Sequence, residues 1–185
     1  MHHLLFADRS LYPSVVLRTP IRTLSWVTGA PLREQLPPTL VFEVEGGKGF
    51  AWPDFVRPAA NIPLVSPRMR QALGQAGASN VDYHPAELVE VTSGARRPYA
   101  AGNVLGLVSA MDRERSTFEP FEEGSPLVSS IERLVLDEAR CAAARIFRLA
   151  EFDLLVVVDD AVARALAGVT GVALMAPEEW DGFRT

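Results

Sequence analysis

The chain has 185 residues, of which 48% are hydrophobic and 22% charged. This balance is typical of a folded globular protein and excludes a disordered one, and the length suits a single domain. The net charge of −5 is opposite in sign to that of a nucleic-acid-binding protein. Cys141 is the only cysteine, so no intrachain disulfide can form, which fits a reducing compartment.

The hydropathy pattern predicts a cytoplasmic protein with no membrane contact. The longest apolar candidate, LLVVV at 154–158, has the size of a strand, whereas a membrane span needs about 20 residues. The start, MHHLLFADRS, lacks a basic region followed by a long apolar core, so we expect no signal peptide.

Residues 1–60 are predicted to form a variable, strand-rich N-terminal part. Segments 14–18 and 39–47 look like strands, and 46–53 is a candidate second arm of a hairpin that turns at two glycines. Several prolines interrupt this part, so long helices are not expected in it.

Residues 63–85 predict a strand–helix–strand unit. Ser66 is a suitable helix N-cap and Pro67 a suitable first helical residue. Apolar residues then recur with helical spacing, and Gly77 is placed to end the helix. A short strand follows, VDYH, which Pro85 is expected to close.

Residues 154–177 repeat this plan. Asp159 or Asp160 takes the cap position, apolar residues follow at the same spacing, Gly171 breaks the helix, and Pro177 closes the strand VALM. Either the two units form one scaffold, or they share a spacing that any strand–helix–strand unit would have; two copies are too few for a solenoid.

Between the units the pattern predicts strands around 103–109 and 145–152, a loop over 116–126 and a helical segment over 137–145. Segment 131–137 is ambiguous and fits a strand better than a helix. The sum is an α+β (mixed α/β) fold: one domain over 1–185, with a mixed sheet and two similar strand–helix–strand units.

The residues suited to catalysis are few. His2 and His3 lie at an end of the chain that we expect to be frayed, and His84 is a lone histidine, a type more often used in packing. Cys141 sits in an alanine-rich run and has the character of a small buried residue. No metal-binding or phosphate-binding motif is present, so no catalytic residue, metal or cofactor is expected.

The acidic excess is concentrated between residues 112 and 138, which hold eight acidic and three basic residues and so account for the whole net charge of −5. Aromatic side chains lie among these acids, and a similar mixture recurs near the end of the chain. The segments are either soluble loops or a protein-binding edge. On the second interpretation the candidate partner-binding residues are Phe118, Glu119, Phe121, Glu122, Glu123 and Trp180.

Several segments occur in an order and spacing that resemble a known family. Asn103, Asp112, Ser116 and Phe118 form the most particular pattern. The segments are WPDFVRP (52–58), 63–88, 103–119, 131–152 and 154–180, and all but the first lie in the family-like part, 61–185. Together they resemble the immunity proteins of bacterial polymorphic toxin systems, whose type member comes from a myxobacterial toxin–immunity pair.

The resemblance implies a non-catalytic protein that binds a cognate toxin and masks its active site. It implies a partner encoded beside this chain, which the acidic region would suit if that toxin is basic. We expect Asn103, Asp112 and Ser116 to be structural, since short polar side chains commonly cap turns. The alternatives are a small cytoplasmic hydrolase that uses carboxylates or His84, and a plain homo-oligomeric structural module.

Overall fold

The computed structural model of the chain describes residues 1–11, 14–21, 26–32, 36–46, 49–58, 61–142 and 144–182. Its strands are β1 (His2–Ala7), β2 (Val15–Leu17), β3 (Leu40–Val44), β4 (Phe55–Val56), β5 (Leu64–Val65), β6 (Val81–Glu90), β7 (Arg96–Val104), β8 (Leu107–Val108), β9 (Thr117–Pro120), β10 (Val128–Arg133), β11 (Ile146–Leu149), β12 (Val156–Asp159) and β13 (Val172–Met175). The helices are α1 (Pro67–Gln75), α2 (Glu138–Cys141) and α3 (Asp160–Ala165), with 3-10 turns η1 (Arg9–Leu11) and η3 (Pro177–Glu179). The fold is therefore α+β, as predicted.

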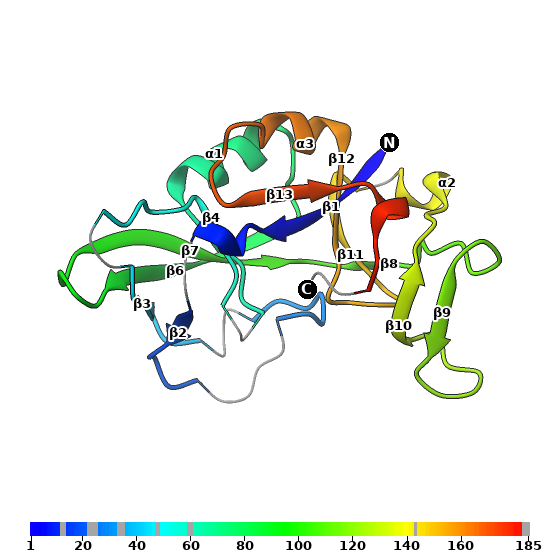
Figure 1. Ribbon diagram of the computed structural model, residues 1–185, viewed down its shortest axis with the longest axis horizontal. Coiled ribbons are helices and arrows are strands. Elements are labelled where there is room, and N and C mark those ends of the chain that lie inside the picture. The colour runs from blue at the N-terminus through cyan, green and yellow to red at the C-terminus, as the bar shows by residue number, and fades with distance from the viewer. Residues whose placement is uncertain are drawn as a thin grey trace.

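In the described ranges the strands form three sheets instead of the single mixed sheet that was expected. The largest has the order β2-β3-β6-β7-β5-β4, the second has the order β13-β1-β12-β11-β8, and β9 pairs with β10 alone. Both larger sheets are mixed, because β3 runs parallel to β6 and β8 runs parallel to β11. Figure 1 shows the β9–β10 hairpin standing away from the body of the molecule.

The two strand–helix–strand units share one topology. In the first, β5 and β6 both pair antiparallel with β7, which lies between them. In the second, β12 and β13 both pair antiparallel with β1. Each unit is thus a crossover between two parallel strands that have an antiparallel strand inserted between them. The sequence repetition is a repetition of structure, with one unit in each large sheet.

Helix α1 begins and ends where the sequence predicts. The Ser66 hydroxyl accepts a hydrogen bond from the Met69 amide at 3.2 Å, and Pro67 occupies the first turn. At the other end, Gly77 has a φ of +80°, and the amide of Ala78 donates to the Leu73 carbonyl at 3.0 Å. A left-handed glycine with this bond forms a Schellman cap.

In α3 the cap is Asp159, whose carboxylate accepts from the Val162 amide at 2.8 Å. Helices α1 and α3 lie against each other on one side of the molecule (Figure 1). Their apolar stripes share one buried cluster with strands of both large sheets, so the two units pack as one body. That cluster comprises Leu5, Phe55, Val65, Met69, Leu73, Ala78, Ala100, Val104, Ile146, Val156, Val158, Val162, Leu166 and Val169.

The second large sheet is buried on both faces. Along β12, Val156 and Val158 point into the cluster beneath the helices, whereas Val157 points into a different cluster on the opposite face. This explains the continuous apolar run at 154–158, since a strand covered on both sides has no solvent face to alternate with.

Several local predictions are wrong for identifiable reasons. β6 continues through Pro85 to Glu90, because the paired strand β7 holds it in register. β3 pairs with β2 and β6, so it forms no hairpin with 46–53; Gly47 and Lys48 of that supposed turn lie outside the described residues. His2 and His3 belong to β1, whose position inside a sheet prevents the fraying that was expected.

Candidate functional site: the acidic hairpin

The predicted loop 116–126 contains a strand, and this changes how its acidic residues are presented. β9 pairs antiparallel with β10, with Phe118 opposite Ile131 and Glu119 opposite Ser130. On β10, Val128 and Ile131 are buried against the body, which anchors the hairpin. The residues between the strands form its tip.

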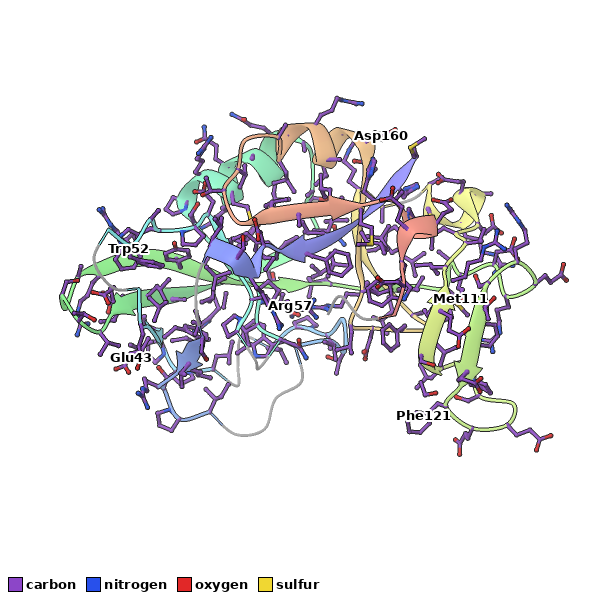
Figure 2. All side chains as sticks on the ribbon, viewed as in Figure 1. Glu43, Trp52, Arg57, Met111, Phe121 and Asp160 are labelled. Carbon is purple, nitrogen blue, oxygen red and sulfur yellow. The ribbon has the colours of Figure 1, made fainter. Side chains whose placement is uncertain are left out.

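The tip exposes an apolar pair surrounded by acids. Phe121 is 68% exposed and Leu127 is 47% exposed, and the amide of Phe121 donates to the carbonyl of Leu127 at 3.0 Å. The side chain of Phe121 points away from the body (Figure 2). Glu119, Glu122 and Glu123 are exposed around this pair. Large exposed side chains of this kind, rimmed by charge, are typical of protein-binding surfaces.

Two of the six predicted contact residues are placed differently. Phe118 is half-buried, with the guanidinium carbon of Arg113 4.4 Å from the centre of its ring. Trp180 is only 3% exposed: its indole N–H donates to the Ile131 carbonyl at 2.7 Å, and its ring stacks on Phe6. Assigning Trp180 to a contact surface is therefore wrong, because it holds β10 against the core.

The polar pattern that carries the family resemblance is structural, as predicted. The Asn103 amide donates to the Ala30 carbonyl at 2.7 Å. The Asp112 carboxylate accepts from the amides of Glu114 and Arg115 at 3.1 Å each, which closes the turn before β9. The Ser116 hydroxyl bonds both backbone groups of Val135. Asp112 and Ser116 thus hold the base of the hairpin, whereas Asn103 ties β7 to the segment that contains Ala30.

The residues considered for catalysis are engaged or buried. The ring Nε2 of His84 lies 2.6 Å from the Pro37 carbonyl, so that nitrogen carries the proton and donates it. Burial, with Glu138 and Asp137 nearby, raises the pKa of the Cys141 thiol to about 11. Within the described part of the chain, no group of three or more His, Cys, Asp or Glu side chains is arranged to hold a metal ion.

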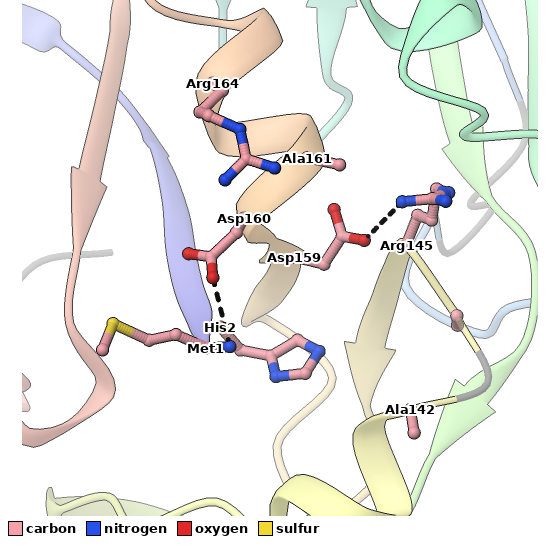
Figure 3. Close-up of a pocket in the computed structure, with 9 residues that line it drawn as sticks. Met1, His2, Ala142, Arg145, Asp159, Asp160, Ala161 and Arg164 are labelled. Carbon is pink, nitrogen blue, oxygen red and sulfur yellow. Dashed lines mark hydrogen bonds and ion pairs between the residues drawn. The ribbon is translucent and has the colours of Figure 1, made fainter.

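A separate pocket of about 540 Å³ lies where β1 meets α3 (Figure 3). Its two aspartates have partners within the chain: Asp159 pairs with Arg145 at 2.8 Å, and Asp160 bonds His3 at 2.9 Å. The bond from His3 is the main cause that lowers the pKa of Asp160. These contacts join sheet and helix, so both aspartates have a structural role.

The sequence reasoning missed two residues at the hairpin. Leu127 gave a usable signal, because it is an apolar residue directly after a Gly-Ser-Pro turn. Glu151 gave none: it lies two residues after β11 and is 4% exposed, and an acid in a turn after a strand ordinarily faces solvent.

The chain belongs to the immunity protein family Imm11, whose family model matches residues 3–179. This confirms the resemblance, and the match also includes most of the first sixty residues, for which only WPDFVRP had been quoted. Membership indicates an immunity function and a non-enzymatic role. A search of the curated proteins found no match. Each helix in the described ranges is too short or too polar to cross a membrane.

Proposed function

We propose that this protein binds a cognate toxin of a bacterial polymorphic toxin system in the cytoplasm and neutralises it without catalysis, by masking the toxin's active site. Family membership supports the class of function. The observation that carries the contact site is the projecting tip of the β9–β10 hairpin, where exposed Phe121 and Leu127 are surrounded by glutamates.

The tip is suited to enter a concave, basic surface. A projecting aromatic side chain fills a pocket and provides most of the binding energy in many interfaces. The surrounding carboxylates, Glu119, Glu122 and Glu123, steer a basic partner toward that contact and increase the association rate. A stable interface buries about 1,600 Å², so the tip acts as an anchor and neighbouring parts of the body complete the contact.

The test is co-expression with the product of the adjacent reading frame. If that product is the toxin, we expect rescue of growth and a complex that survives a sizing column. Growth arrest that persists at matched expression, with no complex, contradicts the proposal.

A charge-reversal experiment tests the contact site. The variant Glu122→Lys/Glu123→Lys should associate with the toxin at least about tenfold more slowly at low salt, and its rate should depend less on salt. Glu45→Lys reverses an exposed charge near β3 and serves as the control. Equal rates for the hairpin variant and the wild type across salt concentrations would place the contact elsewhere.

A further inference from the structure

A groove of about 550 Å³ lies between the tip of the hairpin and the body of the protein. It is lined by Ser109, Arg113, Phe118, Pro120, Glu123, Gly124, Ser125, Pro126 and Glu151. One wall therefore comes from the hairpin and the other from the segments that follow β8 and β11. The groove adjoins the exposed tip, since Glu123 belongs to both.

Glu151 is the unusual member of this lining. It is 4% exposed, and its Oε1 accepts a hydrogen bond from the Ser109 hydroxyl at 2.5 Å. Its Oε2 is buried and has no hydrogen-bond partner. Buried polar atoms are nearly always paired, and a half-paired buried carboxylate is unfavourable. The unpaired Oε2 of Glu151 is therefore suited to accept a hydrogen bond from a donor that lies outside this chain.

The backbone holds Glu151 in place at the base of the hairpin. Its carbonyl accepts from the Val128 amide of β10 at 2.9 Å, and the preceding residue, Ala150, donates to the Val108 carbonyl at 2.9 Å. The carboxylate is thus presented from a fixed junction between the second sheet and the hairpin, which is the kind of rigid support that a binding group needs.

Arg113, in the same lining, is engaged elsewhere. Its guanidinium packs on the Phe118 ring, and its Nη1 donates to the Pro126 carbonyl at 3.0 Å. Within the described ranges these are its contacts, and neither is to Glu123 or Glu151. It therefore shapes the wall, and the two carboxylates leave the groove with a net negative charge.

We propose that this groove receives a lysine or arginine side chain of the partner protein, whose cationic head pairs with Glu151 and Glu123. The walls suit such a side chain, because Phe118, Pro120 and Pro126 offer apolar surface for its methylene stem. The inference rests on the proposed function for the identity of the partner. It adds that one basic residue of the toxin is recognised individually, in addition to general charge attraction.

The first experiment needs no toxin. N-acetyl-arginine amide and N-acetyl-lysine amide are titrated into the protein while backbone amide signals are followed by NMR. We expect saturable shifts at Ser109, Gly124 and Ser125 in the wild type, and no such shifts in Glu151→Gln, which keeps the shape and the acceptor for Ser109. The stronger of the two probes identifies the preferred head group. Absence of shifts at these residues with both probes at about 50 mM overturns the inference.

The second experiment measures the affinity for the toxin. Glu151→Gln should weaken binding at least tenfold, mainly through faster dissociation, whereas Glu132→Gln, an exposed change on β10 outside the groove, should stay within twofold. Thermal unfolding of both variants checks that the fold is intact, and Glu123→Gln offers a second groove variant on the surface. Wild-type affinity in both groove variants overturns the inference while the proposed function stands. If the wild type itself binds no toxin, the proposed function fails, and the probe titration still decides whether the groove takes a cation.

Discussion

Asp54 and Thr170 lie 116 positions apart, and three hydrogen bonds join them. The Asp54 amide donates to the Thr170 hydroxyl at 3.0 Å, and the Asp54 carboxylate accepts from the Thr170 amide at 3.0 Å and from its hydroxyl at 2.9 Å. The same carboxylate accepts from the Ser66 hydroxyl at 2.6 Å. Asp54 thus connects the N-cap of α1 to the turn before β13, so the start of the helix in the first unit is tied to the segment that follows the helix in the second.

Replacing either residue should therefore weaken the junction between the units. Asp54→Ala removes the acceptor of the buried Ser66 hydroxyl and of the Thr170 amide and hydroxyl, so it should lower the free energy of unfolding by about 3 kcal/mol, and Thr170→Val by about 1–2 kcal/mol. Because the two side chains bond each other, the double variant should lose about 1 kcal/mol less than the sum. Urea denaturation of the four proteins measures this, and strict additivity would contradict a direct coupling.

Asp54 should also make stability depend on acid. Burial acts to raise the pKa of this carboxyl, but the bonds from Ser66 and Thr170 outweigh it, so the pKa is lowered. Its contribution is fully present above the ordinary aspartate pKa of about 3.9 and is lost as the pH falls through the lower folded-state value. Between pH 5 and pH 2, Asp54→Asn should therefore lose less stability than the wild type in parallel denaturation curves. Identical acid profiles would exclude this role.

Gly171 permits the close approach of the second unit to β4, the strand that pairs with β5 of the first unit. Its φ is +82°, and a Cβ at this position would lie 2.3 Å from the Phe55 carbonyl oxygen of β4. Gly171→Ala should cost about 2 kcal/mol or more beyond Gly94→Ala, the matched control. Gly94 also has a positive φ, +70°, but a Cβ there meets nothing within 4 Å. The difference between their thermal midpoints isolates the clash, and equal midpoints would show that the units can separate without cost.

The two aromatic residues Phe121 and Trp180 should behave in opposite ways. Trp180→Ala removes a buried ring and should lower the free energy of unfolding by about 3–5 kcal/mol. Phe121→Ala should change stability by less than about 0.5 kcal/mol and act on toxin affinity instead. Denaturation and binding measured on the same samples test this. A large loss of stability in Phe121→Ala would mean that the tip serves the fold.

Cys141 should be inert toward thiol reagents in the native protein. A pKa of about 11 leaves little thiolate at pH 8, and the side chain is buried. Alkylation should be at least about a hundredfold slower than in urea-unfolded protein. A comparable native rate would show that the helix α2 region opens readily.

Much of the local structure could be predicted because its causes are local. Ser66 with Pro67, Asp159 and Gly77 mark the ends of helices through side-chain bonds and backbone freedom that depend on a few neighbouring residues. The prediction that Gly171 breaks the second helix is wrong, because α3 already ends at Ala165 and Gly171 lies in the turn before β13. The short strand β9 escaped prediction, because its pairing with β10 spans a turn rich in charge and gives no clear alternation.

The candidate site was predictable only in part for a related reason. The glutamates and Phe121 stand out by composition, and the structure places them at an exposed tip. Trp180 has a similar sequence context, yet its stacking on Phe6 and its bond to Ile131 bury it. Exposure depends on partners far along the chain, which a sequence pattern does not contain.

By itself, the sequence determined the α+β class, the two repeated units and the acidic segment, since periodicity, caps and charge are properties of short stretches. Only the tertiary structure decided that β7 and β1 are inserted into those units, that Asp54 and Thr170 join them, and that Glu151 lies with an unpaired oxygen beneath the hairpin. These relations arise from packing between distant segments, where burial determines which polar groups find partners.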